Sequence, residues 1–519
     1  MNNKRRILAG LFCFALAVSC LVGCMKNPDN ANLSGTGTSG DSGGKSDAAK
    51  DTLVVALQSD ISTFDPCKFT DLVTQNAVNA LYNKLFKFST TSEVVPDLAE
   101  SYKNISELEW EITLRKDVKF HDGTAMTSAD VKASLERTMA DTSKSHLVGS
   151  IAKVDAPDAN TVLITMKTPT GTLLESLADP CCSILPAALI SSGHDFGSEP
   201  VGTGPYKLVS WEPANKVVFE SFQDYFIAEE VAYYPNLEMR VIPEGSSRTI
   251  ALETGDVDII VDLARSDYNR IHENPNLALY ETAACQLYYL GFNMDDPVCQ
   301  DENFRKAWQY AVDKEGARLV SLEGLGAIVE NVIPANVMGY HADENYTYDP
   351  EKAKELLADA NFTQDKPLVL CCYSEDTSKI AQVIQANMKE VGVEVEIAQN
   401  TTAVHIDGTA KGDFAFFLSG WSTAPNPDRF LRPLYHSSAV GATNAVRLND
   451  PAVDALIDAA ATEVDAAKRE SLYSQALDAI MERSPSVPIC SKPTLVAYNA
   501  ALENVTINSV SETYYNIIK

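Results

Sequence analysis

Hydrophobic and polar residues alternate in short blocks along this chain, and the period changes back and forth between that of a strand and that of a helix. Leu53–Leu57 is an apolar run typical of a buried strand, and Leu72–Leu85 has its apolar residues at helical spacing. The alternation continues to the C-terminus, so the sequence predicts a mixed α/β protein. Further strands are expected at Trp110–Leu114, Val162–Met166, Tyr206–Val209, Val217–Glu220, Leu237–Ile242, Val257–Val261, Tyr288–Phe292, Leu368–Cys372, Val393–Ile397 and Phe414–Leu418.

Residues that begin and end helices stand beside several of the helical blocks. Thr127 precedes a helix expected at Ser128–Met139. Asp349-Pro350 and Asp450-Pro451 each place an acidic N-cap before a proline in the first helical position. Gly255 follows another block as a stop signal. Further helices are expected at Ser247–Glu253, Ile380–Met388, Ala452–Ala461 and Ala466–Met481.

Strand–helix–strand units recur in both halves of the chain. Its 519 residues are too many for one domain. No repeat with a period of about 20–50 residues indicates a solenoid or a propeller. We therefore expect two α/β lobes with a ligand bound in the cleft between them.

The beginning of the chain has the features of an export signal. Basic residues precede the apolar run Ile7–Val22, which is short for a membrane span and suits a signal peptide. The run ends in Leu21-Val22-Gly23-Cys24, which resembles the bacterial lipobox, in which the cysteine thiol carries a diacylglycerol. We expect a signal peptide at 1–23, lipidation of Cys24, and a flexible tether rich in glycine and serine at 24–50.

Acidic residues greatly outnumber basic ones. The chain has 71 Asp and Glu against 42 Lys and Arg, a net charge of −29, with 45% hydrophobic residues as in ordinary globular proteins. An acidic chain without a basic patch repels phosphate, which excludes nucleic acid as a partner.

The cysteines that follow Cys24 form no C-x-x-C pair. Their spacing suits neither a zinc site nor a dense disulfide framework, so we expect mostly buried free thiols. They are Cys67, Cys181, Cys182, Cys285, Cys299, Cys371, Cys372 and Cys490.

Motifs of catalysis are absent from the sequence. No two of the seven histidines lie four residues apart, which excludes the His-Glu-x-x-His pattern, and no Gly-x-Ser-x-Gly elbow occurs. Val201-Gly202-Thr203-Gly204-Pro205 resembles a phosphate loop, but Pro205 lacks an N–H and no helix follows. We interpret this segment as a backbone turn and predict no enzyme activity, no cofactor and no metal.

Eight segments from residue 64 onward follow one another in an order that is informative as a set. They are Phe64–Pro66 with Asn79–Tyr82, Val118–Thr124, Val201–Leu208, Gly255–Asp258, Phe304–Ala307 with Ala311–Lys314, Tyr348–Leu357, Gly420-Trp421 and Pro427-Asp428. In this order they resemble the extracellular solute-binding proteins of peptide and nickel ABC importers, the family that includes dipeptide- and oligopeptide-binding proteins.

The resemblance implies a two-lobed, periplasmic-binding-protein-like fold with an extra subdomain inserted in the first lobe. The first lobe would comprise 51–288, with the insert at about 90–190, and the second lobe 289–487. Residues 488–519 would return to the first lobe. Such proteins close around a ligand like a hinge, and the permease of the importer reads the closed form.

The family's ligand region matches Gly420-Trp421 in this sequence. The resemblance implies ligand contacts at Trp421, Ser422 and Thr423, with Trp421 either stacking as a pocket wall or packing in the core. In related peptide binders an aspartate three residues after the tryptophan pairs with the peptide's free α-amino group. Here that position is Ala424, so recognition of a free amine does not follow from the resemblance.

Five further residues are candidates for the site. Phe69 and Thr70 lie between the first strand and helix, as pocket residues or as surface loop. Tyr82 would contact the ligand or pack in the core, and Arg429 would bind a ligand acid or form a surface ion pair. Asn293, near the expected crossover between lobes, is a candidate hinge.

The sequence therefore predicts a lipid-anchored substrate-binding component of an ABC importer for peptides or peptide-like solutes. It would lie on the extracytoplasmic face of the cell membrane, with the permease and ATPase subunits as partners. Alternatives are the same role for a chelated metal, an opine or a sugar, a secreted hydrolase with a dispersed triad, and a signalling receptor.

Overall fold

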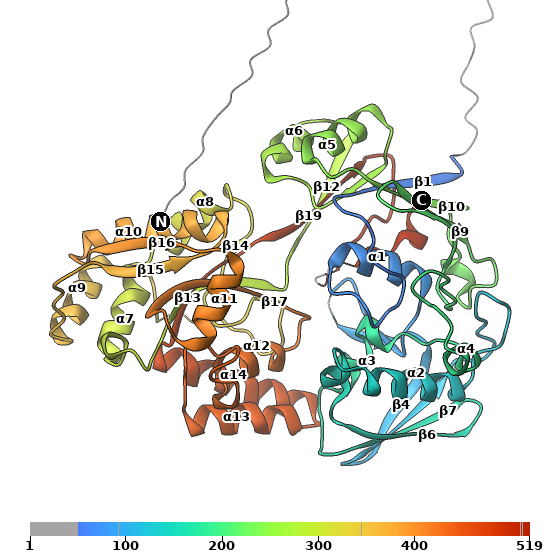
Figure 1. Cartoon of the computed structure of the whole chain (residues 1–519), viewed down its shortest axis with the longest axis horizontal. Helices are drawn as coiled ribbons and strands as arrows, with labels where there is room; N and C mark the ends of the chain where they lie inside the picture. Colours follow the sequence, from blue (N-terminus) through green and yellow to red (C-terminus); the bar gives the residue numbers. More distant parts are fainter. Residues whose placement is uncertain (1–49, 92, 344, 509, 511) are drawn as a thin grey trace, which may run out of the picture. The chain divides into compact units, whose positions relative to one another are not determined.

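The computed structural model describes residues 50–91, 93–343, 345–508, 510 and 512–519. The predicted signal peptide at 1–23, the lipidated Cys24 and the tether up to residue 49 lie outside the described residues. Residues from Lys50 to Lys519 form one compact unit. Most of its strands form two large sheets, and each sheet is the centre of one lobe (Figure 1).

A seven-stranded sheet forms the centre of the first lobe, in the order β12-β19-β11-β1-β10-β9-β8. The first strand, β1, lies in the middle and pairs in parallel with β10 and β11. The C-terminal strand β19 inserts between β12 and β11. The strands are β1 Thr52–Leu57, β8 Tyr206–Glu212, β9 Lys216–Ser221, β10 Asn236–Val241, β11 Ile259–Val261, β12 Leu277–Ala283 and β19 Pro493–Asn499.

An extra subdomain is inserted in this lobe between β1 and β8, as predicted. It contains a four-stranded antiparallel sheet in the order β4-β5-β7-β6, and α2 lies against it. These elements share a separate hydrophobic core. Its strands and helices are β2 Phe86–Phe88, β3 Val94–Pro96, β4 Ala99–Ser106, β5 Glu109–Leu114, β6 Ile151–Asp158, β7 Thr161–Met166, α2 Ser128–Ala140, α3 Leu173–Leu177 and α4 Ala187–Ser192.

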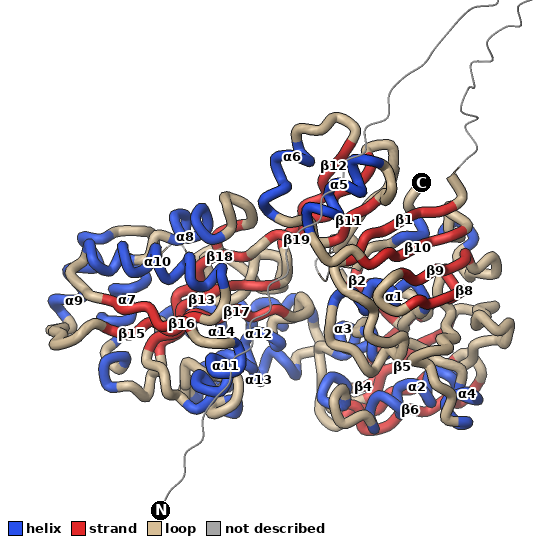
Figure 2. Tube along the Cα trace, turned by 45° about the horizontal axis from the view of Figure 1, so that its top comes forward, coloured by secondary structure: helices blue, strands red, loops and turns tan. Residues whose placement is uncertain are grey.

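A six-stranded sheet forms the centre of the second lobe, in the order β14-β18-β13-β17-β15-β16. Helices pack on it, and Figure 2 shows them around the strands. The strands are β13 Gln286–Phe292, β14 Ala327–Ile328, β15 Leu368–Cys372, β16 Val395–Gln399, β17 Phe416–Ser422 and β18 Ser486–Ser491. The helices are α7 Glu302–Ala311, α8 Lys314–Ser321, α9 Pro350–Asp359, α10 Glu375–Glu390, α11 Thr402–Lys411, α12 Asp428–Tyr435, α13 Pro451–Thr462 and α14 Ala466–Arg483.

The chain passes between the two large sheets twice. The first crossover joins β12 to β13 at 284–285, and the second joins β18 to β19 at Lys492. Both differ by a few residues from the boundaries drawn on the sequence, at 288 and 487. The reason is that β13 pairs with β17 from Gln286 onward and β18 pairs with β13, so both whole strands belong to the second sheet.

Cap residues set several helix ends as the sequence predicts. Thr127 and Asp130 form a capping box on α2, and Asp349 and Asp450 cap α9 and α13. The helix α1, Leu72–Leu81, ends four residues earlier than predicted. Its cap Tyr82 is extended, and Asn83 and Lys84 then bind the carboxylate of Asp97 instead of continuing the helix. The remaining helices are α5 Gly245–Thr254 and α6 Tyr268–His272.

The eight cysteines within the described residues are all free and buried, as the sequence predicts. Burial raises the pKa of the Cys67 thiol to about 11. A thiol that stays protonated is a poor nucleophile, so Cys67 acts as a small apolar core residue. Among the described residues, no helix is long and apolar enough to cross a membrane.

Candidate ligand-binding cleft

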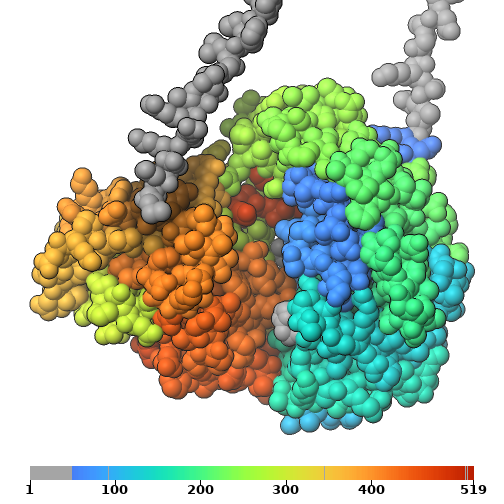
Figure 3. Space-filling view, viewed as in Figure 1, coloured from blue at the N-terminus to red at the C-terminus, as the bar shows by residue number. Residues whose placement is uncertain are grey.

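A cavity of about 1330 Å³ lies between the two lobes. Its lining includes the end of β1, the start of α1 and the start of α5 from the first lobe. The second lobe contributes the beginning of β13, the end of β17 and the start of α12, and both crossovers add residues. Figure 3 shows the hollow on the surface between the lobes, with red C-terminal segments visible inside it. A ligand held here would touch both lobes at once.

Trp421 forms part of the cleft wall on the second lobe, and its contact with a ligand stays a prediction. It is the penultimate residue of β17, where it pairs with Leu287 of β13. Its indole Nε1 donates a hydrogen bond of 2.9 Å to the backbone carbonyl of Arg429. The ring is half-buried and lines the cavity. The predicted contacts Ser422 and Thr423 follow it along the same wall.

Arg429 lines the cavity and pairs with the first lobe. Its Nη1 lies 3.3 Å from Oδ2 of Asp179, at the start of the short 3₁₀ helix Pro180–Cys182. Burial by itself would raise the pKa of Asp179. The charge of Arg429 and hydrogen bonds from Cys181 outweigh burial and hold this pKa below its ordinary value. The carboxylate is therefore ionised, and the ion pair spans the cleft.

A second ion pair joins the lobes at another point of the cleft. Arg265 of the first lobe donates from Nη2 to Oδ1 of Asp376 at 2.6 Å, in the first turn of α10. The hydroxyl of Tyr288 donates to the other carboxylate oxygen of Asp376 at 2.9 Å. Burial and the neighbouring carboxylate raise the pKa of Tyr288, so its hydroxyl stays protonated and remains a donor.

On the first lobe, Thr70 and Leu72 line the cavity, and Leu72 is 52% exposed. Phe69 does not line it. Its side chain is 6% exposed within the core, and the ammonium of Lys144 lies over its ring and donates to its carbonyl. The loop therefore presents Thr70 to the cleft and turns Phe69 inward, because an apolar ring gains more from burial than a threonine does.

Tyr82 is a core residue in this structure, 2% exposed, and it does not line the large cavity. Its ring lies under the turn at Val201-Gly202-Thr203-Gly204-Pro205. A Cβ on Gly202 would come within 2.4 Å of that ring and 2.2 Å of the carbonyl oxygen of Leu81. This close packing explains the glycine, and it supports the interpretation of the segment as a turn.

Asn293 follows β13 at the end opposite to the crossover. It is 5% exposed, and its side-chain amide donates to the carbonyl of Gly412 within the second lobe. Its position therefore gives no support to the predicted hinge role. The residues at the crossovers, Cys285 and Lys492, line the cleft instead.

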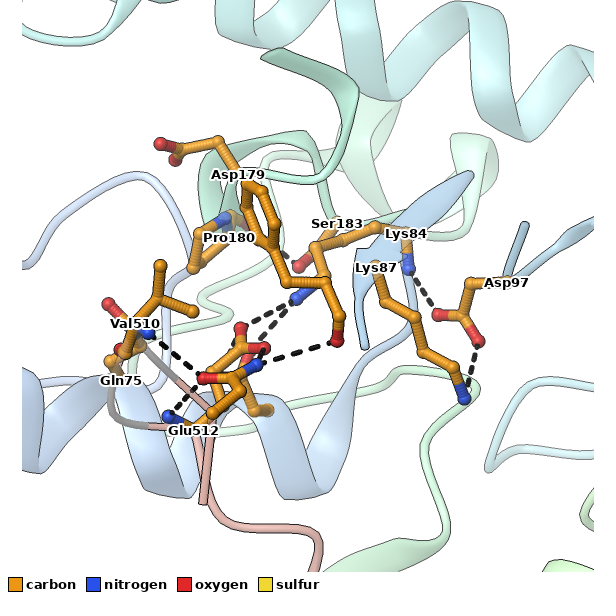
Figure 4. A network of polar contacts seen from close by, with 12 residues as sticks. Gln75, Lys84, Lys87, Asp97, Asp179, Pro180, Ser183, Val510 and Glu512 are labelled. Carbon is orange, nitrogen blue, oxygen red and sulfur yellow. Dashed lines mark hydrogen bonds and ion pairs between the residues drawn. The ribbon is translucent and has the colours of Figure 1, made fainter. Parts of the chain in front are cut away.

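The C-terminal segment closes one side of the cleft. Glu512 lines the cavity and accepts a hydrogen bond of 3.1 Å from the ammonium of Lys84. Both side chains are almost fully buried, at 4% and 5% exposed. Gln75 of α1 donates to the carbonyl of Val510, which also lines the cavity (Figure 4). The end of the chain is thus fixed against α1 as a structural part of the site.

Charges of both signs line the cavity in equal number, although the chain as a whole is strongly acidic. The acidic excess is therefore located mostly on other surfaces. The lysine ammonium at position 492 is exposed and has no ion-pair partner among the described residues. The basic residues are Lys144, Arg248, Arg265, Arg429 and Lys492, and the acidic ones are Asp179, Asp262, Glu323, Glu375 and Glu512.

The sequence indicated Arg429 but not its partner Asp179, and it did not indicate the Arg265–Asp376 pair. Asp179 and Arg429 are separated by 250 positions, and Arg265 and Asp376 by 111. No local pattern marks such pairs, although Asp179-Pro180 repeats the acid–proline signature of the predicted helix caps. Within the described ranges, no group of three or more His, Cys, Asp or Glu side chains could hold a metal ion.

Comparisons with known proteins agree with this architecture. The family model of bacterial extracellular solute-binding proteins, family 5, middle region, matches residues 93–442. The glutathione-binding protein GsiB of Pectobacterium atrosepticum is 29% identical over 471 residues, which cover 87% of this chain and 90% of that protein.

Two solved structures show the same fold. HbpA2 from Haemophilus parasuis has a TM-score of 0.82 at 26% identity, covering 90% of this chain and 99% of that one. The periplasmic binding protein DppA from Helicobacter pylori, in complex with the peptide STSA, has a TM-score of 0.72 at 26% identity, covering 90% and 97%. The predicted fold class is confirmed.

Proposed function

The chain belongs to the family 5 bacterial extracellular solute-binding proteins, and on this premise we propose that it is the lipid-anchored receptor of an ABC importer that captures peptides or peptide-like solutes. Family members and the relatives named above are substrate-binding proteins of transporters and not enzymes. This chain therefore binds its solute without transforming it, and the secreted hydrolase is set aside.

The charge balance of the cleft carries the proposal of a peptide-like solute. Ten fixed charges, half of each sign, line one cavity together with Trp421 and the exposed Leu72. A peptide presents the same mixture, with an ammonium, a carboxylate, amide groups and apolar side chains. A neutral sugar would offer no opposite charge to a cavity charge that lacks an ion pair among the described residues, such as Lys492, and desolvating that charge would oppose binding.

Contacts from both lobes explain how a permease can distinguish the ligand-bound protein from the empty one. Within the described residues the lobes are joined by two crossovers, and the cavity walls belong to both lobes. A ligand that touches both walls stabilises the closed arrangement over the open one, and a transporter reads that difference.

Names of the relatives suggest the first solutes to test. One relative is a glutathione-binding protein, and one neighbouring structure contains the peptide STSA. Thermal unfolding of the purified chain with glutathione, short peptides, a nickel–histidine chelate, an opine and sugars decides the class. A ligand at a hundred times its Kd stabilises the folded state by about 2.7 kcal/mol.

We expect glutathione or short peptides to raise the Tm, while sugars leave it unchanged. If another solute raises the Tm and no peptide does, the peptide class is wrong. Addition of the same solutes to an unrelated protein with a similar Tm controls for solvent effects. Neighbouring genes for two permeases and two ATPases are expected, and their absence would favour a signalling receptor.

A further inference from the structure

The two ion pairs that cross the cleft differ in how fully their hydrogen-bonding groups are used. Asp376 receives two N–H groups of Arg265 and the hydroxyl of Tyr288. Asp179 and Arg429 share one contact of 3.3 Å, and no other hydrogen bond to that guanidinium occurs within the described residues. A guanidinium has five N–H donors, so most of those on Arg429 remain available to a ligand.

The carboxylate of Asp179 is held in place from behind. Its Oδ1 accepts the backbone N–H of Cys181 at 3.1 Å, and its own carbonyl accepts the N–H of Cys182 at 2.9 Å. The side chain is 18% exposed and lines the cavity. Each carboxylate oxygen has two lone-pair sites, which leaves acceptor capacity for a ligand cation.

Arg429 is positioned by the second lobe. Its backbone N–H donates to the carbonyl of Asn426, and its carbonyl receives the indole N–H of Trp421. Burial raises the pKa of Glu175, on α3 of the first lobe, and the nearby charge of Arg429 acts in the opposite direction. The guanidinium is 20% exposed and lines the cavity beside the tryptophan ring.

We propose that the Asp179–Arg429 pair is the receptor for an α-amino-acid head group, in which one carbon carries both an ammonium and a carboxylate. The ammonium binds Asp179 and the carboxylate binds Arg429, so that four charges alternate in sign around a square. This inference rests on the proposed function and specifies the solute class.

The short distance between the two protein charges is what selects such a head group. Asp179 and Arg429 lie 3.3 Å apart, so a ligand that pairs with both needs opposite charges at a similar spacing. An ammonium and a carboxylate on one carbon are about 3 Å apart. In an ordinary linear peptide the free ammonium and the free carboxylate are at opposite ends. Each residue can add about 3.5 Å to the distance between them. Peptides that are γ-linked through a glutamate side chain keep both charges on one carbon.

Solutes with one charge fit this site less well. An anion would pair with Arg429 and compete with Asp179, and a cation would do the reverse, which leaves one buried charge without a full partner in either case. A zwitterionic head adds a partner to each charge. The remaining cavity, about 1330 Å³ in total, is much larger than this head and accommodates the rest of the ligand.

Two isomeric tripeptides test the inference, γ-Glu-Ala-Gly and α-Glu-Ala-Gly. They have the same atoms and net charge, but in the γ isomer alone do the free ammonium and a carboxylate share a carbon. Titration calorimetry on the purified full-length chain should give a Kd about 10- to 100-fold lower for the γ isomer, as for hydrogen bonds between charged groups.

The variants Asp179→Asn and Arg429→Gln should each bring the two Kd values within about threefold of each other. Asparagine still caps the 3₁₀ helix, so the first variant keeps its local fold. The matched control is Arg432→Gln on the same helix. Arg432 pairs with Asp428 and Asp458 inside the second lobe and does not line the cavity, so the γ preference should persist.

Equal binding of the two isomers by the wild-type chain would overturn the inference, as would a γ preference that survives Asp179→Asn and Arg429→Gln. If neither isomer binds, a defined pool of linear di- to pentapeptides is titrated next. Binding of that pool retains the proposed function and refutes the head-group site. No binding of any peptide refutes both.

Discussion

The indole N–H of Trp421 donates to the backbone carbonyl of Arg429 at 2.9 Å, and this bond joins the end of β17 to the start of α12. Both residues line the cleft. The bond therefore fixes an aromatic wall and a guanidinium relative to each other, and a ligand meets them as one surface.

Replacing Trp421 by phenylalanine removes this bond and keeps most of the ring. We expect the free energy of unfolding to fall by about 1 kcal/mol and ligand affinity to fall several-fold, because Arg429 loses its positioning contact. Urea unfolding and calorimetry with the stabilising solute measure the two effects. Trp110→Phe is the matched control, because the indole N–H of Trp110 has no hydrogen-bond partner among the described residues. An unchanged affinity in Trp421→Phe would contradict the positioning role.

Acid should destabilise the protein through His121. Burial lowers the pKa of His121 to about 4, and in the neutral ring Nε2 donates to the carbonyl of Gly204 while Nδ1 accepts the N–H of Gly202. The unfolded chain binds a proton near pH 6.5 and the folded chain only near pH 4. Stability is therefore full above pH 6.5 and is lost as the pH falls to 4, by roughly 3 kcal/mol.

Urea unfolding at several pH values checks this prediction. His121→Gln should weaken the decline between pH 6.5 and pH 4, although burial also lowers the pKa of His405 to about 4 and leaves a second contribution. His272→Gln, at an exposed position, should keep the wild-type profile. The same slope in the His121 and His272 variants would refute the assignment.

Removing one partner of the buried Lys84–Glu512 pair should destabilise the protein more than replacing both partners. Glu512→Gln leaves a buried ammonium without its counter-charge and should cost about 3–5 kcal/mol of stability. The double variant Lys84→Met with Glu512→Leu should recover much of this loss, since apolar groups can fill the same space. Chemical unfolding of the single and double variants gives the coupling.

A surface ion pair provides the comparison for these single and double variants. Lys119→Met should change stability by about 1 kcal/mol or less, because Lys119 and Asp224 are both exposed. Equal losses at the buried and the surface pair would show that burial does not set the value of the Lys84–Glu512 contact.

Lipidation at Cys24 is a prediction from the sequence alone. Cys24→Ser should abolish incorporation of labelled palmitate and move the protein from the membrane fraction to the medium or the periplasm. Cys20→Ser, within the predicted signal peptide, should leave both properties unchanged. Incorporation of labelled palmitate into the Cys24→Ser variant would show that the lipid is attached to another residue.

Local signals in the sequence predicted much of the fold. Leu368–Cys372 forms the predicted strand with the same bounds, and Asp349 and Asp450 cap helices where the acid–proline pairs indicate. The end of α1 was predicted too late, because the hydrophobic period continues past Tyr82. What stops the helix is Asp97, which binds Asn83 and Lys84 from a later part of the chain.

The candidate residues agree best with the cavity lining where one contiguous segment forms the wall, and their contact with a ligand stays a prediction. Trp421, Ser422 and Thr423 line the cleft, as does Thr70. Phe69 and Tyr82 are core residues, and apolar type alone cannot tell a pocket wall from a core position. Asp179 and Arg265 could not be found, because their importance comes from partners that the fold brings from the opposite lobe.

The two crossovers are themselves joined, since the N–H of Ala284 donates to the carbonyl of Lys492 at 3.3 Å and the hydroxyl of Ser491 donates to the carbonyl of Ala284 at 3.3 Å. Two crossovers that are hydrogen-bonded to each other bend together more easily than they slide past each other. The lobes should therefore rotate about one short hinge axis that passes through this linked pair. The backbone of Lys492 forms part of that axis. A residue on the axis moves least during the rotation, so an arriving solute meets the Lys492 backbone at nearly the same place before and after closure.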